Sequence, residues 1–223
     1  MVECRNITKS YGSNKVLDGI SFKLKKGMIY GLVGENGSGK TTLFRSILGL
    51  ESHGGEVFYE EGIKQRTGYL STESYFFPYM KGIEYMRFLS EARGKKYVTD
   101  GSNLFDLPLE EFVSGYSTGM QKKLAFQALL LQENKFIILD EPFNGVDLQG
   151  NMLIMGVVEK LRDSGCTLIV SSHILSTLTK MCNEIFVIKN KVIEQVVDKG
   201  SYKTLEKSFN KEWIDRKLSS IKL

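Results

Sequence analysis

Short apolar runs separated by glycine-containing turns organise this chain, and stretches with helical spacing lie between them. Residues 2–27 alternate between apolar and polar positions, with turn signals at 12–14 and 25–27. Alternation of this kind is typical of half-buried strands, so we expect antiparallel strands here. Residues 28–33 form one apolar run and predict a buried strand.

Further strands and helices follow in alternation. We expect strands at 56–59, 67–70, 135–139, 166–170, 184–188 and 192–197, and helices at 42–50 and 149–162. Helical spacing dominates residues 76–134, interrupted by an irregular segment at 94–109. There the predicted buried faces consist of Tyr85, Phe88, Leu89 and Ala92 on one helix and Leu124, Ala128 and Leu131 on another.

This order predicts an α/β fold of a single domain, residues 1–223. Residues 1–75 and 135–200 are expected to form a core with a mixed sheet flanked by helices, preceded by an antiparallel β subdomain. Residues 76–134 read as a helical insertion. Residues 201–223 are expected to form a tail of two short helices with a break near Asn210.

Composition is that of an ordinary globular protein: 223 residues, 42% hydrophobic and 25% charged, with a net charge of +4. No apolar stretch approaches the length needed to cross a membrane, and no apolar signal region follows the first residues. We therefore expect any membrane role to require a partner. Three cysteines without C-x-x-C spacing favour reduced thiols and a cytosolic location.

The strongest chemical signal follows the apolar run at 28–33. Gly34, Gly39, Lys40 and Thr41 fit the phosphate-loop spacing G-x-x-x-x-G-K-[ST]. Glycines allow backbone N–H groups to converge on a triphosphate, and the following helix adds the positive end of its dipole. Lys40 is expected to contact the β- and γ-phosphates and the Thr41 hydroxyl to ligate Mg²⁺.

Two acidic residues, Asp140 and Glu141, stand directly after the apolar run of the strand at 135–139. In doubly wound sheets ligands bind at the carboxyl ends of the strands. Asp140 is therefore expected to hold Mg²⁺, and Glu141 to lie within reach of the attacking water. His173 follows another predicted strand and points to the same site, although an ordinary buried or surface histidine is an equally good interpretation.

Tyr11 lies in the first predicted turn and has two interpretations. An exposed aromatic ring there can stack on adenine, or it can be a turn tyrosine without a ligand.

The segment Tyr116-Ser-Thr-Gly-Met-Gln-Lys-Lys123, here called the signature segment, decides between families of phosphate-loop proteins. Together with residues 34–41, Leu139-Asp-Glu-Pro142, Asp147 and His173, it closely resembles the ATP-binding cassette (ABC) ATPase family over about residues 2–200.

The resemblance implies a role for each matching residue. Tyr11 stacks on adenine, Asp140 organises Mg²⁺, Glu141 polarises the hydrolytic water and His173 contacts the γ-phosphate. The phosphates are cradled by Gly34, Asn36, Gly37, Ser38, Gly39, Lys40, Thr41 and Thr42. Ser117 and Gly119 present their hydroxyl and amide groups to ATP bound by a second copy, which implies a head-to-tail dimer with ATP at the interface. Asp147 lies in the loop that joins the two sites.

Several positions depart from the family pattern. The usual signature is Leu-Ser-Gly-Gly-Gln, and Tyr116, Thr118 and Met120 replace three of its residues while Ser117 and Gly119 are kept. Residues 144–146 read Asn-Gly-Val where the family prefers Ser-Ala-Leu. Thr72 occupies the place of a glutamine that touches Mg²⁺, and the alternative is that Glu73 supplies that contact.

We therefore expect the ATP-binding and ATP-hydrolysing subunit of an ABC transporter, with ATP and Mg²⁺ as cofactors. Its expected partners are a membrane-spanning permease and a second ABC ATPase, the latter in a homodimer or heterodimer. The chain itself is expected in the cytoplasm, bound to the inner face of the cell membrane. The form of the signature segment and the lack of a C-terminal regulatory domain favour export. The alternatives are a soluble ABC ATPase acting on the ribosome or nucleic acid, although no nucleic-acid partner is expected, and a module that binds ATP without hydrolysing it. Glu141 speaks against the last of these.

Overall fold

The computed structural model describes residues 2–97, 103–207 and 209. Its central sheet has six strands in the order β5-β6-β7-β3-β8-β9. Their bounds are β3 Ile29–Val33, β5 Thr67–Leu70, β6 Phe136–Leu139, β7 Thr167–Ser172, β8 Glu184–Lys189 and β9 Val192–Asp198. The first five strands of this order pair in parallel and β9 pairs antiparallel with β8, so the predicted mixed sheet is confirmed.

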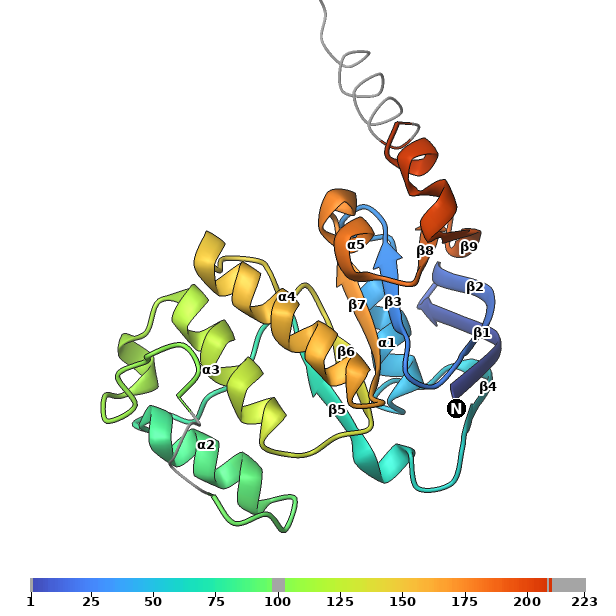
Figure 1. Ribbon diagram of the computed structural model, residues 1–223. Coiled ribbons are helices and arrows are strands. Elements are labelled where there is room, and N and C mark those ends of the chain that lie inside the picture. Colours follow the sequence, from blue (N-terminus) through green and yellow to red (C-terminus); the bar gives the residue numbers. More distant parts are fainter. Residues whose placement is uncertain (1, 98–102, 208, 210–223) are drawn as a thin grey trace, which may run out of the picture.

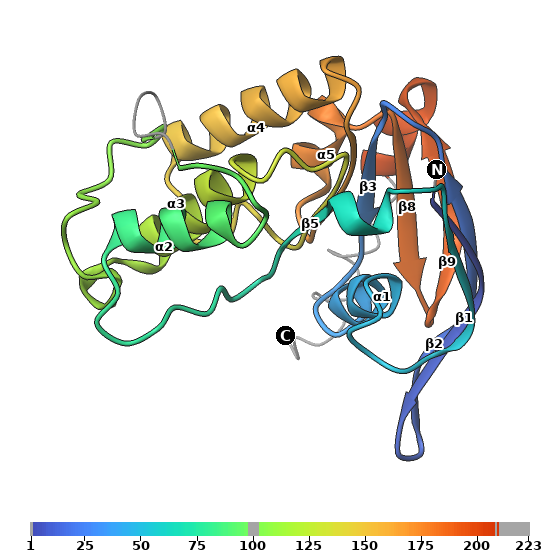
Figure 2. The same cartoon turned by 90° about the horizontal axis from the view of Figure 1, so that it is seen from below.

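A second sheet confirms the predicted antiparallel β subdomain. It has the order β2-β1-β4, with β1 at Val2–Tyr11, β2 at Asn14–Leu24 and β4 at Gly54–Tyr59. Strand β4 returns to this sheet although the phosphate loop and a helix separate it from β1 and β2 in sequence, an arrangement that the apolar pattern alone did not predict. Figure 2 shows the helix α1 (Lys40–Ile47) beside this sheet and the central strands.

Apolar packing joins α1 to both sheets. Leu43, Phe44 and Ile47 on α1 are buried in one core with Ile7 of β1 and Tyr30 of β3. This is the stripe that helical spacing predicts for the helix after the phosphate loop. The helix begins at Lys40 rather than residue 42, because Gly39 caps it with φ 101°, a left-handed conformation that suits glycine.

Two helices lie against the central sheet on the side opposite to α1. Helix α4 (Leu148–Asp163) matches its prediction to within one residue at either end. Helix α5 (Leu175–Met181) was not predicted. Strand β7 extends to Ser172, two residues beyond its prediction, which places Ser171 and Ser172 inside the sheet.

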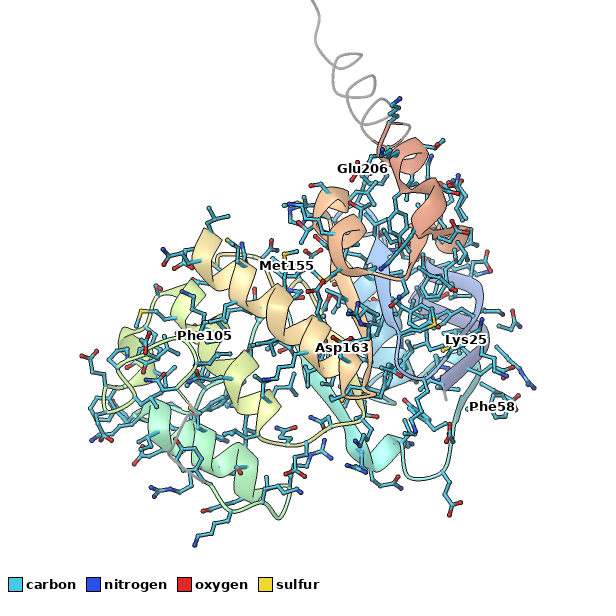
Figure 3. The ribbon with its side chains drawn as sticks, in the orientation of Figure 1. Lys25, Phe58, Phe105, Met155, Asp163 and Glu206 are labelled. Atoms are coloured by element: carbon cyan, nitrogen blue, oxygen red, sulfur yellow. The ribbon has the colours of Figure 1, made fainter. Side chains whose placement is uncertain are left out.

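The insertion holds helices α2 (Gly82–Glu91) and α3 (Thr118–Leu130), which pack against each other, with α3 also beside the edge strand β5 (Figures 1 and 2). The described residues of 94–109 are irregular, as expected. The predicted buried face of α2 is partly wrong: Phe88 is 48% exposed and Ala92 is exposed, whereas Met86 is fully buried. The Phe105 ring packs edge-on to Phe126 of α3, 6.2 Å between centroids, and Figure 3 labels Phe105 beside that helix.

The last described residues pack on the sheet. Residues 202–207 are helical, Tyr202 donates a hydrogen bond to the Cys182 carbonyl over 3.1 Å, and Thr179 donates to Glu206, labelled in Figure 3, over 2.6 Å. The predicted second tail helix and the break near Asn210 lie outside the described residues. Among the described helices, none is both long and apolar enough to cross a bilayer.

Candidate functional site

The phosphate loop connects a buried strand to a buried helix, as its sequence predicts. All residues of β3 are buried, Gly34 follows it, and α1 begins at Lys40. A Cβ atom on Gly34 would lie 2.5 Å from Ile188 Cγ2 and 2.6 Å from Ser38 Oγ, so only glycine fits there. Asn36 and Gly37 are exposed at the tip of the loop, and Thr42 is half-buried in the first turn of the helix.

Lys40 is held in the centre of this loop. Its Nζ donates to the carbonyl oxygens of Gly34 over 2.8 Å and Glu35 over 3.1 Å, and the residue is only 6% exposed. A buried ammonium needs such partners. These two hydrogen bonds hold the Lys40 side chain inside the phosphate loop.

Asp140 is the most thoroughly hydrogen-bonded carboxylate of the site. It is fully buried, and its Oδ2 accepts from Thr41 Oγ1 over 2.6 Å and from the Tyr69 phenol over 3.4 Å. Its Oδ1 accepts from Ser171 Oγ over 2.7 Å. Burial raises the pKa of the Tyr69 phenol and the charge of Asp140 raises it further, so Tyr69 stays a hydrogen-bond donor.

Glu141 joins Lys40 to His173. Glu141 Oε1 lies 3.4 Å from Lys40 Nζ, and Oε2 lies 3.1 Å from His173 Nδ1. The Glu141 backbone has φ 51°, a left-handed conformation uncommon outside glycine, and its N–H donates to Ser171 Oγ over 2.9 Å. Unfavourable backbone conformations persist where the surroundings fix them, often at functional sites.

The site residues fit a nucleotide with Mg²⁺. Mg²⁺ prefers oxygen ligands and is usually held by one or two protein oxygens together with substrate phosphates. The hydroxyl of Thr41 and the carboxylate of Asp140 provide such a pair at the phosphate loop. Ser38 Oγ is buried in the loop without a hydrogen-bond partner among the described residues, which suits a loop that receives further acceptors.

Tyr11 lies at the far end of the antiparallel sheet. It is the last residue of β1, paired with Asn14 across the hairpin, and is 47% exposed. The ammonium of Lys9 lies 4.9 Å from the centre of its ring. A cavity of about 580 Å³ lies between this hairpin, the tip of the phosphate loop and the β8–β9 turn. Its lining includes Asn36, Gly37 and Ser38.

Ser117 and Gly119 lie elsewhere in the molecule, at the start of α3 (Figure 1). Ser117 is exposed, and its Oγ caps the helix by accepting from the Met120 N–H over 3.3 Å. A Cβ atom on Gly119 would lie 2.4 Å from the Gly145 carbonyl oxygen, so the helix start packs against the backbone before α4. Tyr116 is buried and donates to the Pro108 carbonyl over 2.7 Å.

Asp147 caps α4 and also contacts the signature segment. Its Oδ1 accepts from the Gly150 N–H over 2.7 Å, and its Oδ2 lies 2.7 Å from Lys123 Nζ. The hydrogen bond from Lys123, aided by the Gly150 amide, lowers the pKa of Asp147.

Thr72 and Glu73 differ in burial. Thr72 Oγ1 is buried without a hydrogen-bond partner among the described residues, whereas Glu73 is exposed. Of these two side chains, that of Thr72 is therefore the one that points into the protein.

Sequence reasoning missed three contributors to this arrangement. Ser171 and Tyr69 bond to Asp140, and Lys122 of α3 donates to the carbonyls of Ser71 and Thr72. Only Ser171 carried a signal in the sequence, because it is a polar residue at the end of the apolar run of β7, and that signal does not name its partner.

The chain matches known proteins over most of its length. The family profile described as ABC transporter matches residues 17–144. The bacitracin transport ATP-binding protein BcrA of Enterococcus faecalis is 33% identical, with 88% of this chain and 69% of that protein covered. The lantibiotic transport ATP-binding protein SrtF of Streptococcus pyogenes is 28% identical, with 95% and 97% covered. An uncharacterised ABC transporter ATP-binding protein of Methanocaldococcus jannaschii, MJ1023, is 32% identical, with 84% and 74% covered.

Solved structures show the same fold. The dimeric structure of MJ0796, a bacterial ABC transporter cassette, superimposes with a TM-score of 0.79 at 19% identity, covering 89% of this chain and 99% of that one. A structure of the ATP-binding subunit of an ABC transporter gives 0.77 at 22% identity, with 89% and 90% covered. As its motif order predicts, this chain belongs to the ABC transporter family of ATP-binding proteins.

Proposed function

We propose that this chain is the ATP-hydrolysing subunit of an ABC transporter and that it powers export through a separate membrane-spanning partner. One observation carries the proposal: Glu141 contacts both the phosphate-loop lysine, Lys40, and the histidine after β7, His173. A carboxylate between a phosphate-binding cation and a histidine is placed to act on a water molecule beside the terminal phosphate. Relatives are named for bacitracin transport, for lantibiotic transport and for linearmycin resistance, and a resistance function favours the export direction.

The roles of the core residues follow from their contacts. The loop 34–42 binds the triphosphate through its amides, and Lys40 turns from the carbonyls and Glu141 toward the phosphates. Thr41 and Asp140 hold Mg²⁺, which neutralises phosphate charge when bound. Glu141 orients the attacking water and accepts its proton, with His173 positioned on its second oxygen. Tyr11 provides a ring for the adenine base.

A second copy completes the site. Ser117 and Gly119 lie at the N-terminus of α3, where a helix favours anions, yet in a different part of the molecule from the phosphate loop. We assign them to ATP bound by the opposite subunit in a head-to-tail homodimer or heterodimer. In this proposal residues 76–134 carry the signature segment, and residues 1–75 and 135–200 form the nucleotide-binding core of the same domain.

Dimerisation of the hydrolysis-deficient variant tests this proposal. Glu141→Gln with ATP and Mg²⁺ is expected to sediment as a dimer that retains nucleotide. The reason is that ATP binding closes the head-to-tail dimer, and without hydrolysis the dimer cannot reopen. The same protein with ADP, and Lys40→Ala with ATP, should remain monomeric. A Glu141→Gln protein that stays monomeric at high concentration and retains no ATP contradicts the shared site.

Partner identity needs a separate experiment. Photocrosslinking from exposed positions on the native protein in its own membranes is expected to yield an adduct with a multi-spanning membrane protein at the cytoplasmic face. Crosslinks only to ribosomal proteins or nucleic acid would contradict the transport role and leave ATP hydrolysis untouched.

A further inference from the structure

Lys122 is a buried cation outside the predicted site. It lies in α3, three residues after Gly119, and is 4% exposed. Its Nζ donates to the carbonyl oxygen of Ser71 over 3.1 Å and also to that of Thr72. A buried ammonium is costly unless it is paired, so these two carbonyls fix its position.

The two carbonyls belong to the segment that leaves β5 beside the acidic strand end. The Asp140 N–H donates to the Leu70 carbonyl over 2.9 Å, so Ser71 and Thr72 continue directly from the strand neighbouring Asp140 and Glu141. Ser71 Oγ also donates to the Glu73 carbonyl over 2.6 Å. The ammonium therefore fastens α3 to the edge of the catalytic strands, across the boundary between the insertion and the core.

Three carboxylates act on the buried ammonium of Lys122. Burial lowers its pKa, while the carboxylates of Asp140, Glu141 and Glu73 act in the opposite direction. The Thr72 hydroxyl, beside one of the bonded carbonyls, is buried without a partner among the described residues.

We propose that Lys122 is a positioning residue for hydrolysis: its ammonium holds residues 71–72 in place beside Asp140 and Glu141 and ties their position to the start of α3. The inference rests on the proposed ATPase function. It assigns no contact between Lys122 and nucleotide, so it predicts an effect on turnover rather than on ATP affinity.

Three substitutions separate the contributions. Lys122→Met removes both donors and charge at similar size, Lys122→Gln keeps a neutral donor, and Lys122→Arg keeps charge and donors. The matched control is Lys95→Met, which removes a half-exposed lysine paired with Glu133 in the same insertion. All four are measured by amide hydrogen exchange, chemical denaturation and steady-state ATP hydrolysis.

Loss of the Lys122 bonds should raise hydrogen exchange of the segment 71–74 at least about tenfold in Lys122→Met, the effect of one lost charge-assisted hydrogen bond. The kcat should fall at least about tenfold while KM for ATP changes less than about twofold. Lys122→Arg should recover part of both effects, Lys122→Gln should resemble Lys122→Met in kcat, and Lys95→Met should change neither. If Lys122→Met does not fold, the comparison of Lys122→Gln with Lys122→Arg decides.

Unchanged exchange at 71–74 in folded Lys122→Met or Lys122→Gln overturns the proposal, as does unchanged kcat. A wild-type protein that hydrolyses no ATP instead overturns the proposed function, and the exchange result still reports on the lysine bonds. The two failures are therefore distinguishable.

Discussion

Ser171 Oγ donates a hydrogen bond to Asp140 Oδ1 over 2.7 Å and accepts one from the Glu141 N–H over 2.9 Å. One hydroxyl on β7 thus fixes both acidic residues at the end of β6. All three residues are buried, so neither bond can be replaced easily by water.

Removal of this hydroxyl should destabilise the strand end. Hydrogen bonds to charged groups contribute about 1.5–3 kcal/mol, and we expect Ser171→Ala to lower the free energy of unfolding by that amount. Urea denaturation measures it. Ser172→Ala is the matched control, because the neighbouring serine is equally buried and accepts only a neutral bond from the Ile174 N–H. A larger loss in Ser172→Ala would contradict the assignment.

Glu141→Gln should separate ATP binding from ATP hydrolysis. The amide retains the size of the carboxylate and can still contact His173, but it cannot accept the proton of the attacking water. We expect ATP affinity within about twofold of wild type and hydrolysis slower by about 10²–10⁴. Single-turnover kinetics and fluorescent-nucleotide titration measure the two quantities. Wild-type turnover in this variant would remove Glu141 from the catalytic role.

The sequence predicted that the phosphate loop and the acidic strand end lie together, because the motifs that define them are local. Four spaced residues define the phosphate loop, and the two acids directly follow an apolar run. Each of these segments follows a parallel strand of the same sheet, so Thr41 and Asp140 meet although they are far apart in sequence. The resemblance to ABC ATPases added the signature segment, whose distance from the loop no periodicity reveals.

Other features escaped prediction because they depend on packing between distant elements. Nothing at Ser171 or Lys122 reveals its partner until β7 and α3 are placed beside β6 and β5. The face of α2 was partly wrong at Phe88, because an aromatic at helical spacing can remain 48% exposed. Helix α5 has only seven residues, too few for a clear period.

The Lys123–Asp147 pair should make stability depend on pH. Since the folded state lowers the pKa of Asp147, the pair stabilises the fold above the ordinary value of 3.8 and loses that contribution as pH falls through the lower folded value. Asp147→Asn keeps an acceptor for the Gly150 N–H and removes the charge. The difference in unfolding free energy between wild type and Asp147→Asn should be constant above about pH 5 and shrink below pH 3.8. A difference that grows on acidification would contradict the ion pair.

The three thiols should be unreactive in the folded protein. Cys4, Cys166 and Cys182 are at most 4% exposed, and burial raises the pKa of Cys4 to about 12 and that of Cys182 as well. Thiolates are the reactive form, so Ellman's reagent at pH 8 should label no thiol in the native protein and all three in urea. Rapid labelling of any one cysteine without denaturant would show that the packing around it opens.

Gly119 offers a test that separates packing from anion binding at the signature segment. Alanine keeps the backbone N–H that would face a second nucleotide, but its Cβ would lie 2.4 Å from the Gly145 carbonyl oxygen, which is backbone and cannot rotate away. We expect Gly119→Ala to displace the start of α3 and to lower the free energy of unfolding by about 1–3 kcal/mol. Gly115→Ala is the control, because nothing lies within 4 Å of a Cβ atom there. In the Glu141→Gln background, ATP-dependent dimerisation should be lost in Gly119→Ala and kept in Gly115→Ala. If Gly119→Ala dimerises normally, the contact with Gly145 does not set the position of the signature segment.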